Sequence, residues 1–469
     1  MVGIKSFGAY VPCYRLSQES IAQAWGRPPR KGEKAVANFD EDSLTMATEA
    51  SINCLAGLGR DGLGGVYFAS TTAPYREKQT ASILATALDL GNPLRAADFG
   101  GSLRSGTIAL RAAMDAVAGG LAEVLVSAAD CRLAEPGGDV EPQLGDAAAS
   151  LLIGASDLSV EIEAAHSICD EFLDTWRRAG DTYIVSGDAR FSQTCGYMRV
   201  MEEAGRSMLD QTDMKAGDFA RAVFHSPDAR SHVAVAKKLG FEASQLQDPL
   251  LGTVGHCGAA HALLMLVATL EEARPGDRIL FLSYGDGCDA LVLRVTEKIE
   301  SLRPQRNLQA LLGAKRPLSS YQKYLKFRGI IPEQKTWAPF SSPIIYWREQ
   351  KQYLRFHGVR CRSCGRLQYP MVRICRGCGA KDKFDEVRVS HRGKVFSFEA
   401  EHYFPSPDPP TVMAEVDLED GARVLLQMTD FEPGSVQVGM PVELTLRSYH
   451  EGSRFINYYW KCRPVRGGA

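Results

Sequence analysis

Across the first 300 residues, short apolar segments alternate with long alanine-rich segments of helical periodicity. The segments 66–70, 123–130, 149–154 and 278–285 are apolar and bounded by Gly or Asp, which predicts strands buried on both faces. Strands of this kind, separated by helices, form layered α/β folds in which helices cover the faces of a sheet. A second block of the same pattern begins near Val160 and indicates two similar halves.

The length and charge of the chain limit its number of domains and its classes of binding partner. Its 469 residues exceed what one hydrophobic core organises and indicate two or three domains. Lys and Arg number 54 against 56 Asp and Glu, so the net charge of −2 gives no general attraction to nucleic acid or to an anionic membrane. No apolar run approaches the roughly 20 residues that span a bilayer, and the N-terminus lacks the pattern of an export signal. We therefore expect a cytoplasmic protein that binds neither membrane nor nucleic acid.

The pattern changes after the predicted first domain, residues 1–302. Residues 303–350 are rich in Pro, basic and aromatic residues without steady periodicity, which is typical of a linker or a strap on a surface. Residues 351–384 contain a cysteine cluster, and residues 385–469 contain about five short strands, which predict an all-β barrel. Aromatic residues exposed on such a barrel can bind single-stranded nucleic acid, but on barrel strands they more often pack in the core. The residues concerned are Tyr403, Phe404, Tyr458, Tyr459 and Trp460.

Four of the twelve cysteines form the strongest local signal in the sequence. Two Cys-x2-Cys pairs are separated by ten residues, and each pair places two thiolates on one tight turn. Four sulfur ligands give the tetrahedral arrangement of a structural zinc and leave no position for a reacting water. We predict a small rubredoxin-like zinc ribbon, with iron as the alternative metal. Its ligands are Cys361, Cys364, Cys375 and Cys378.

Five segments of the first domain resemble archaeal-type 3-hydroxy-3-methylglutaryl-CoA (HMG-CoA) synthases of the thiolase superfamily. The segments are 3–26, 33–50, 174–201, 222–241 and 283–293, and they occur in the family's order. The resemblance implies a duplicated thiolase-like fold of five αβαβα layers, a coenzyme A thioester as substrate, and a homodimer. The cysteine cluster and the barrel together resemble the zinc-ribbon/OB-fold domains that accompany acyl-CoA enzymes. That second resemblance adds a pathway partner enzyme as a candidate partner.

Two positions at which the family carries its covalent chemistry differ in this chain. The acyl-accepting Cys of the synthases corresponds to Leu103, which cannot accept an acyl group. The catalytic Glu corresponds to Thr71, whose hydroxyl is no general base near neutral pH. Ser102 is kept as a substrate-binding candidate, although turn or capping duty is commoner for such a serine. The thiols of Cys131 and Cys257 could approach the pocket, but we expect them to pack as small buried hydrophobes.

Two histidines remain as candidate catalytic residues. His225 matches the superfamily histidine that contacts the thioester carbonyl, and His256 stands where the synthases have Asn. Two imidazole N–H groups aimed at one oxygen would stabilise an enolate; alternatively, one ring donates while the other moves a proton. Lys237 and Lys238 lie where the family places basic side chains near the CoA phosphates, with a solvated helix face as the alternative. The segment 285–289 resembles the family's Gly-rich turn beside the active site.

These features favour an enzyme that makes or breaks a C–C bond next to an acyl-CoA thioester. Aldol or retro-aldol chemistry on a β-hydroxyacyl-CoA fits best, because it needs enolate stabilisation and proton transfer but no acyl-enzyme. The first alternative is Claisen acyl transfer of the thiolase or synthase type, with a nucleophile that is unrecognised or supplied by a partner. The second is a non-catalytic scaffold that binds acyl-CoA. The histidine pair favours an enzyme over a scaffold. His261, five residues after His256, is expected to pack in a helix.

Overall fold

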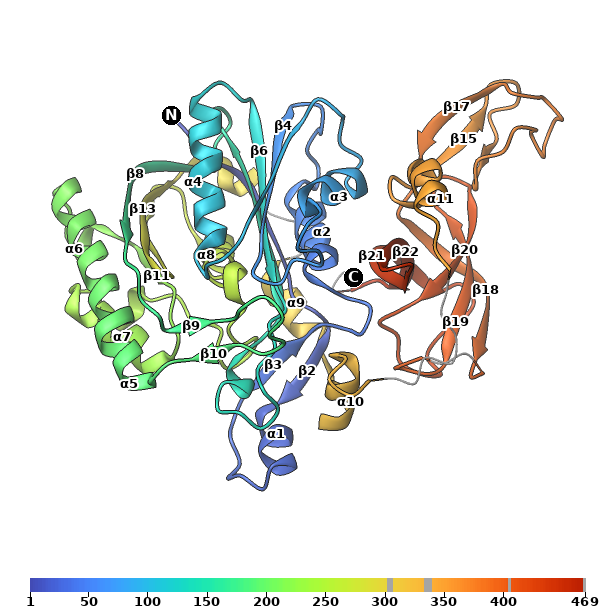
Figure 1. Ribbon diagram of the computed structural model, residues 1–469. Coiled ribbons are helices and arrows are strands. Elements are labelled where there is room, and N and C mark those ends of the chain that lie inside the picture. Colours follow the sequence, from blue (N-terminus) through green and yellow to red (C-terminus); the bar gives the residue numbers. More distant parts are fainter. Residues whose placement is uncertain (302–306, 333–339, 404–405, 467–469) are drawn as a thin grey trace. The chain divides into compact units, whose positions relative to one another are not determined.

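The computed structural model describes residues 1–301, 307–332, 340–403 and 406–466. Residues 303–306 and 333–339 of the predicted strap, and residue 302 of the predicted first domain, therefore lie outside the described residues. None of the helices described is long and apolar enough to cross a membrane. The chain divides into two units (Figure 1). The first comprises Met1–Ala37, Asp42–Ala85 and Leu90–Tyr321, and the second comprises Asn38–Glu41, Thr86–Asp89 and Gln322–Ala469.

A nine-stranded mixed sheet organises the first unit. Its strands are β1 (Gly3–Tyr10), β4 (Leu63–Ala69), β5 (Arg95–Phe99), β6 (Glu123–Asp130), β7 (Ala147–Gly154), β8 (Val160–Cys169), β11 (Arg221–Phe224), β12 (Arg278–Tyr284) and β13 (Gly287–Val295). They pair in the order β11-β12-β13-β8-β1-β7-β6-β4-β5. The two halves of the sheet meet where β1 pairs with β8, through only two residue pairs.

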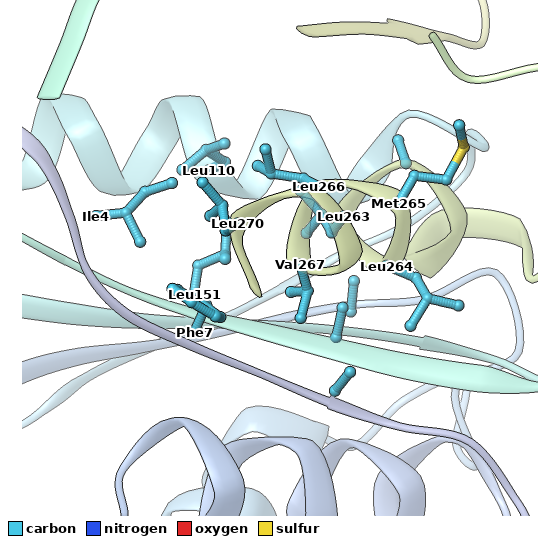
Figure 2. Packing of buried hydrophobic residues seen from close by; sticks show 14 of the residues in the cluster. Ile4, Phe7, Leu110, Leu151, Leu263, Leu264, Met265, Leu266, Val267 and Leu270 are labelled. Carbon is cyan, nitrogen blue, oxygen red and sulfur yellow. The ribbon is translucent and has the colours of Figure 1, made fainter. Parts of the chain in front are cut away.

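Five helices complete the layers of the first unit: α2 (Ser43–Cys54), α4 (Ser105–Ala118), α6 (Arg199–Thr212), α7 (Ala229–Lys238) and α8 (His261–Glu272). Every residue of α8 from His261 to Leu270 is buried, as a helix in a central layer must be (Figure 2). Strands β11 to β13 pack against helices on both faces, because alternate side chains of a strand point to opposite faces of the sheet. Val223 belongs to the core cluster around α8, whereas Phe224 belongs to the cluster formed with α6 and α7. The five-layer thiolase-like fold is therefore confirmed.

The remaining elements of the first unit are short. A small sheet contains β2 (Tyr14–Ser17), β3 (Glu33–Val36) and β14 (Arg316–Pro317), and a hairpin pairs β9 (Thr175–Trp176) with β10 (Val185–Ser186). The other helices are α1 (Gln18–Ala24), α3 (Thr80–Ala87), α5 (Ala189–Phe191) and α9 (Leu308–Gly313). Helix α3 ends in the second unit, because that unit includes Thr86–Asp89.

The second unit combines a three-stranded sheet with a closed five-stranded barrel. Its helices are α10 (Tyr321–Phe327), α11 (Pro343–Arg348) and α12 (Gln350–Tyr353). The small sheet has β15 (His357–Cys361), β16 (Leu367–Gln368) and β17 (Phe384–Arg388). The barrel has β18 (Arg392–Glu401), β19 (Thr411–Leu418), β20 (Arg423–Met428), β21 (Pro441–Gly452) and β22 (Phe455–Pro464), in the order β18-β19-β20-β22-β21. Full closure leaves no open sheet edge and confirms the predicted barrel.

The aromatic residues that the sequence singles out in this region differ in burial, and Tyr459 is half-buried. Tyr458 and Trp460 are buried, and the indole N–H of Trp460 donates to the backbone carbonyl of Leu354 at 2.8 Å. Core packing was the right expectation for these two. It is wrong for Tyr403, which is 92% exposed. Phe404 lies outside the described residues.

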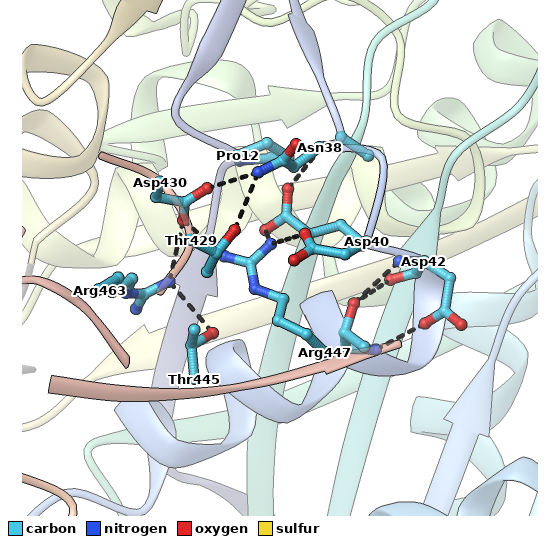
Figure 3. A network of polar contacts seen from close by, with 12 residues as sticks. Pro12, Asn38, Asp40, Asp42, Thr429, Asp430, Thr445, Arg447 and Arg463 are labelled. Atoms are coloured by element: carbon cyan, nitrogen blue, oxygen red, sulfur yellow. Dashed lines mark hydrogen bonds and ion pairs between the residues drawn. The ribbon is translucent and has the colours of Figure 1, made fainter. Parts of the chain in front are cut away.

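A buried network of opposite charges lies in the second unit (Figure 3). The guanidinium of Arg447 pairs with Asp40, Glu41 and Asp430, and Arg463 pairs with Glu443. Burial alone would favour a neutral Asp430, but the charges of Arg447, Arg463 and Arg466 hold the pKa of that carboxyl below its ordinary value. Each buried charge is thus offset by an opposite one, as stability requires.

Candidate active site

The two candidate histidines lie side by side in the first unit. His225 follows β11 and precedes α7, whose first turn is capped by the carboxylate of Asp228. His256 lies in the turn that leads through Gly258–Ala260 into α8. The Nε2 atoms of the two rings are 2.8 Å apart, and both rings are buried. The fold therefore brings together the two residues that the resemblance singled out.

Arg132 contacts the other ring nitrogen of His256. Its Nη2 atom is 2.7 Å from His256 Nδ1, and the backbone N–H of Gly258 donates to the same nitrogen at 3.2 Å. Arg132 is only 6% exposed. Burial lowers the pKa of this guanidinium, and the charge of Asp130 opposes that shift. A buried positive charge is thus placed directly beside the histidine pair.

A third ring, that of His261, completes the cluster. It stacks on His256 with 4.7 Å between centroids and 10° between planes, and its Nδ1 accepts the backbone N–H of Cys257 at 3.3 Å. His261 is the first residue of α8, so it packs in a helix as expected, but it also supports the catalytic candidate. Burial lowers the pKa of His225 to about 3, with the charge of Arg132 adding to the shift, and burial lowers the pKa of the other two rings as well. All three imidazoles are therefore neutral near pH 7.

Thr71, at the position of the family's Glu, donates to a carboxylate from a different strand. Its hydroxyl and backbone N–H both bond to Asp130, at 2.9 Å and 2.7 Å. Ser70 and Thr72 add further bonds to the same carboxylate, and Ala259 donates its N–H at 2.7 Å. Because its lone pairs are occupied by these donors, Asp130 ties the 70–72 loop to the start of α8 and is not free to remove a proton.

Gly258 is required by this arrangement. Its φ is +55°, and a Cβ atom built on it would lie 2.0 Å from an oxygen of Asp130. We expect Gly258→Ala to lower the free energy of unfolding by about 1–3 kcal/mol, because both the φ and the clash must be accommodated. Equilibrium denaturation with urea measures this change. The matched control is Gly217→Ala, where an added Cβ meets no atom within 4 Å; equal stability loss in the two variants would contradict the prediction.

Leu103 occupies the turn before α4. The neighbouring Ser102 accepts the backbone N–H of Arg104 at 3.2 Å, and Arg104 is the N-cap residue of that helix. The Gly-rich turn packs against the same place: a Cβ on Gly285 would lie 2.8 Å from the backbone nitrogen of Arg104 and 3.1 Å from the hydroxyl oxygen of Ser102. The guanidinium of Arg104 is held in turn by Asp289, at 3.2 Å. Ser102 thus performs a turn contact, and its substrate-binding role stays a prediction.

The other candidates lie in different surroundings. Lys237 and Lys238 end helix α7 and are exposed, and the ammonium of Lys238 pairs with Glu202 at 2.6 Å. Their contact with CoA phosphates also stays a prediction.

Burial raises the pKa of the Cys257 thiol well above its ordinary value, which disfavours the reactive thiolate. Cys131 is half-buried, with its sulfur 3.5 Å from the hydroxyl oxygen of Ser43.

The four clustered cysteines lie in the second unit, on and beside its small sheet. Their sulfur atoms all lie within 4.8 Å of one another. Two of the separations are 3.7 Å, between Cys361 and Cys378, and 3.5 Å, between Cys364 and Cys375. A regular tetrahedron with metal–sulfur bonds of about 2.3 Å has edges of about 3.8 Å, so the cluster fits a four-sulfur metal site.

Comparison with known proteins identifies the family. The hydroxymethylglutaryl-CoA synthase of Methanopyrus kandleri is 35% identical over 340 residues, which span 70% of this chain and 97% of the relative. That of Aeropyrum pernix is 36% identical over 340 residues, which span 70% of this chain and 94% of the relative. The chain belongs to the hydroxymethylglutaryl-CoA synthase family. A solved HMG-CoA synthase complexed with CoA supports the fold, with a TM-score of 0.64 at 20% identity over 69% of this chain and 89% of the other.

Two family models match parts of this HMG-CoA synthase family member. The model described as the C-terminal part of 3-oxoacyl-[acyl-carrier-protein] synthase III matches residues 209–295, which include both candidate histidines. The model described as the C-terminal OB-fold domain of ChsH2 matches residues 386–447, which lie mostly in the barrel. The thiolase-like and OB-fold assignments thus rest on separate parts of the chain.

Arg132 and Asp130 were not predicted from the sequence as members of the site. Their position in the sequence was a signal, because Asp130 ends the apolar segment 123–130 and Arg132 follows it by two residues. Polar residues at the carboxyl end of a buried strand often line a site in α/β proteins. Which ring atom they would contact could not be inferred, since the contacts depend on a turn more than 120 residues later in the chain.

Proposed function

We propose that this HMG-CoA synthase family member catalyses aldol or retro-aldol chemistry on a β-hydroxyacyl-CoA without forming an acyl-enzyme. The observation that carries the proposal is the buried His225–His256 pair, whose Nε2 atoms are 2.8 Å apart, in a chain with Leu103 at the acyl-accepting position. The pair offers the groups that enolate chemistry needs, and the leucine removes the covalent route of the family.

The surroundings support this reading. Thr71 replaces the family's Glu, and the carboxylate that it contacts, that of Asp130, is occupied by backbone and hydroxyl donors. The neutral state of both imidazoles near pH 7 suits groups that must donate and accept in one step. The named relatives are hydroxymethylglutaryl-CoA synthases, and an acyl-CoA substrate is carried over from them as part of the proposal.

In the cleavage direction, one histidine accepts the proton of the β-hydroxyl as the Cα–Cβ bond breaks. The electron pair of that bond passes to the thioester as an enolate, whose oxygen is held by the N–H of the other histidine. The enolate carbon then takes up the proton, leaving a ketone or aldehyde and a shorter acyl-CoA. Proton and electrons balance within the substrate and the histidine pair, and condensation is the reverse.

The test combines product detection with intact-protein mass. The enzyme is incubated with a panel of β-hydroxyacyl-CoAs, free ketone or aldehyde is trapped as a hydrazone, and the protein mass is recorded in parallel. We expect carbonyl release with no mass gain. An acyl adduct that maps to Ser102, Cys131 or Cys257 would instead establish Claisen transfer, and acyl-CoA binding without product or adduct would establish the scaffold.

We further infer that the second unit holds one structural zinc ion through its four cysteines. The short sulfur–sulfur distances support this assignment, and a site filled by four thiolates supplies folding energy and no chemistry. The homodimer and the pathway partner enzyme expected from the resemblances remain predictions.

A further inference from the structure

The proton positions in the histidine pair follow from the contacts of Arg132. A guanidinium group has five N–H donors and no acceptor, so Arg132 can only donate to His256 Nδ1, 2.7 Å away. The backbone N–H of Gly258 is a second donor to the same atom. A proton on Nδ1 would face two N–H groups, so the neutral ring of His256 carries its proton on Nε2.

This assignment determines His225 as well. The Nε2–H of His256 lies 2.8 Å from His225 Nε2, so that nitrogen must accept, and the proton of His225 must sit on Nδ1. Nδ1 of His225 is buried and has no hydrogen-bond partner among the described residues, so the contact with His256 alone assigns its proton. The two imidazoles are therefore opposite tautomers, although they have the same chemical composition.

We propose that Arg132 is the positioning residue that assigns different roles to the two histidines. His256 becomes the N–H donor to the substrate carbonyl oxygen, and His225 becomes the acceptor of the substrate proton. As negative charge develops on the carbonyl oxygen, it offsets the positive charge of Arg132 and raises the proton affinity of His225 when the proton must be taken up. These catalytic roles rest on the proposed function, whereas the tautomers are a property of the resting protein.

Nitrogen NMR of the protein labelled with 15N-histidine tests the tautomers directly. The chain has nine histidines, and His225→Gln and His256→Gln variants assign the two signals. We expect the neutral Nε2–H pattern for His256 and the neutral Nδ1–H pattern for His225 in the wild-type protein. Nδ1–H on His256, or the same tautomer on both rings, overturns the proposal without any need for a substrate.

Arg132→Met and Arg132→Lys separate positioning from packing. In the methionine variant we expect His256 to populate both tautomers and kcat for carbonyl release to fall about 10–100-fold with little change in KM. In the lysine variant, which keeps a cationic donor, we expect the wild-type tautomer and recovery of kcat to within about tenfold of wild type. A methionine variant with unchanged tautomers and unchanged kcat overturns the proposal. If that variant does not fold, the wild-type spectrum and the lysine variant still test whether Arg132 sets the two tautomers.

The matched control is Arg177→Met, which removes a neighbouring cation without touching a histidine. The charges of Arg177 and Arg132 interact, but Arg177 donates to the backbone carbonyl of Thr71. We expect the control to retain the wild-type tautomers. Opposite tautomers in a protein that releases no carbonyl product would contradict the proposed function and leave this assignment standing.

Discussion

Replacement of His225 by alanine is expected to reduce turnover about 10³-fold. The variant removes the buried group that we place at the reacting atoms, and such acid–base and oxyanion groups each contribute effects of this size. The imidazole of His256 remains, but it loses its 2.8 Å partner. Steady-state rates of carbonyl release measure the loss, and isothermal titration with CoA should show unchanged binding.

Two further variants make the His225 result interpretable. His225→Gln keeps a polar side chain of similar size, so loss of rate in both variants excludes a cavity as the cause. His402→Ala removes an exposed histidine from the second unit and should leave the rate unchanged. Full activity in His225→Ala would remove the proposed site.

Loss of the metal is expected to unfold the ribbon in the second unit before it affects the chemistry. The first cysteine ends β15 and the two cysteine pairs lie on either side of β16, strands of only five and two residues. A structural zinc supplies about 10–16 kcal/mol of apparent binding free energy in small zinc domains. After treatment with a chelator, hydrogen exchange should accelerate across residues 346–384. Carbonyl release should continue in the same sample, because the histidine pair belongs to the first unit.

Metal analysis of single variants completes this test. Wild-type protein should contain one zinc per chain, and Cys375→Ser should lose it together with the protection from exchange. Cys195→Ser alters an exposed cysteine outside the cluster and should change neither value. A rate that falls before any exchange appears would contradict a purely structural metal, and iron in place of zinc would identify the rubredoxin-like alternative.

The layered first domain, the cysteine cluster and the barrel could all be predicted from the sequence. Each depends on a local pattern: apolar strands alternating with helical segments, two Cys-x2-Cys turns, and short strands between turns. The departures at Leu103 and Thr71 were also visible, because a resemblance read position by position exposes a missing functional group. Such features need only neighbouring residues, so they can be predicted before the fold is known.

The contacts within the site could not be predicted from the sequence, because they form between distant segments of the folded chain. Arg132 and His256 are 124 residues apart, and Asp130 and Ala259 are 129 apart, yet each pair is hydrogen-bonded. The segment Asn38–Glu41 likewise follows β3 in the chain but belongs to the second unit, where Glu41 pairs with Arg447. Hydrogen bonds and ion pairs act over a few ångströms in space, and sequence separation does not encode those distances. The chemical groups of the site could therefore be predicted from the sequence. The hydrogen-bond partner of each group, and with it the position of each proton, depends on the fold.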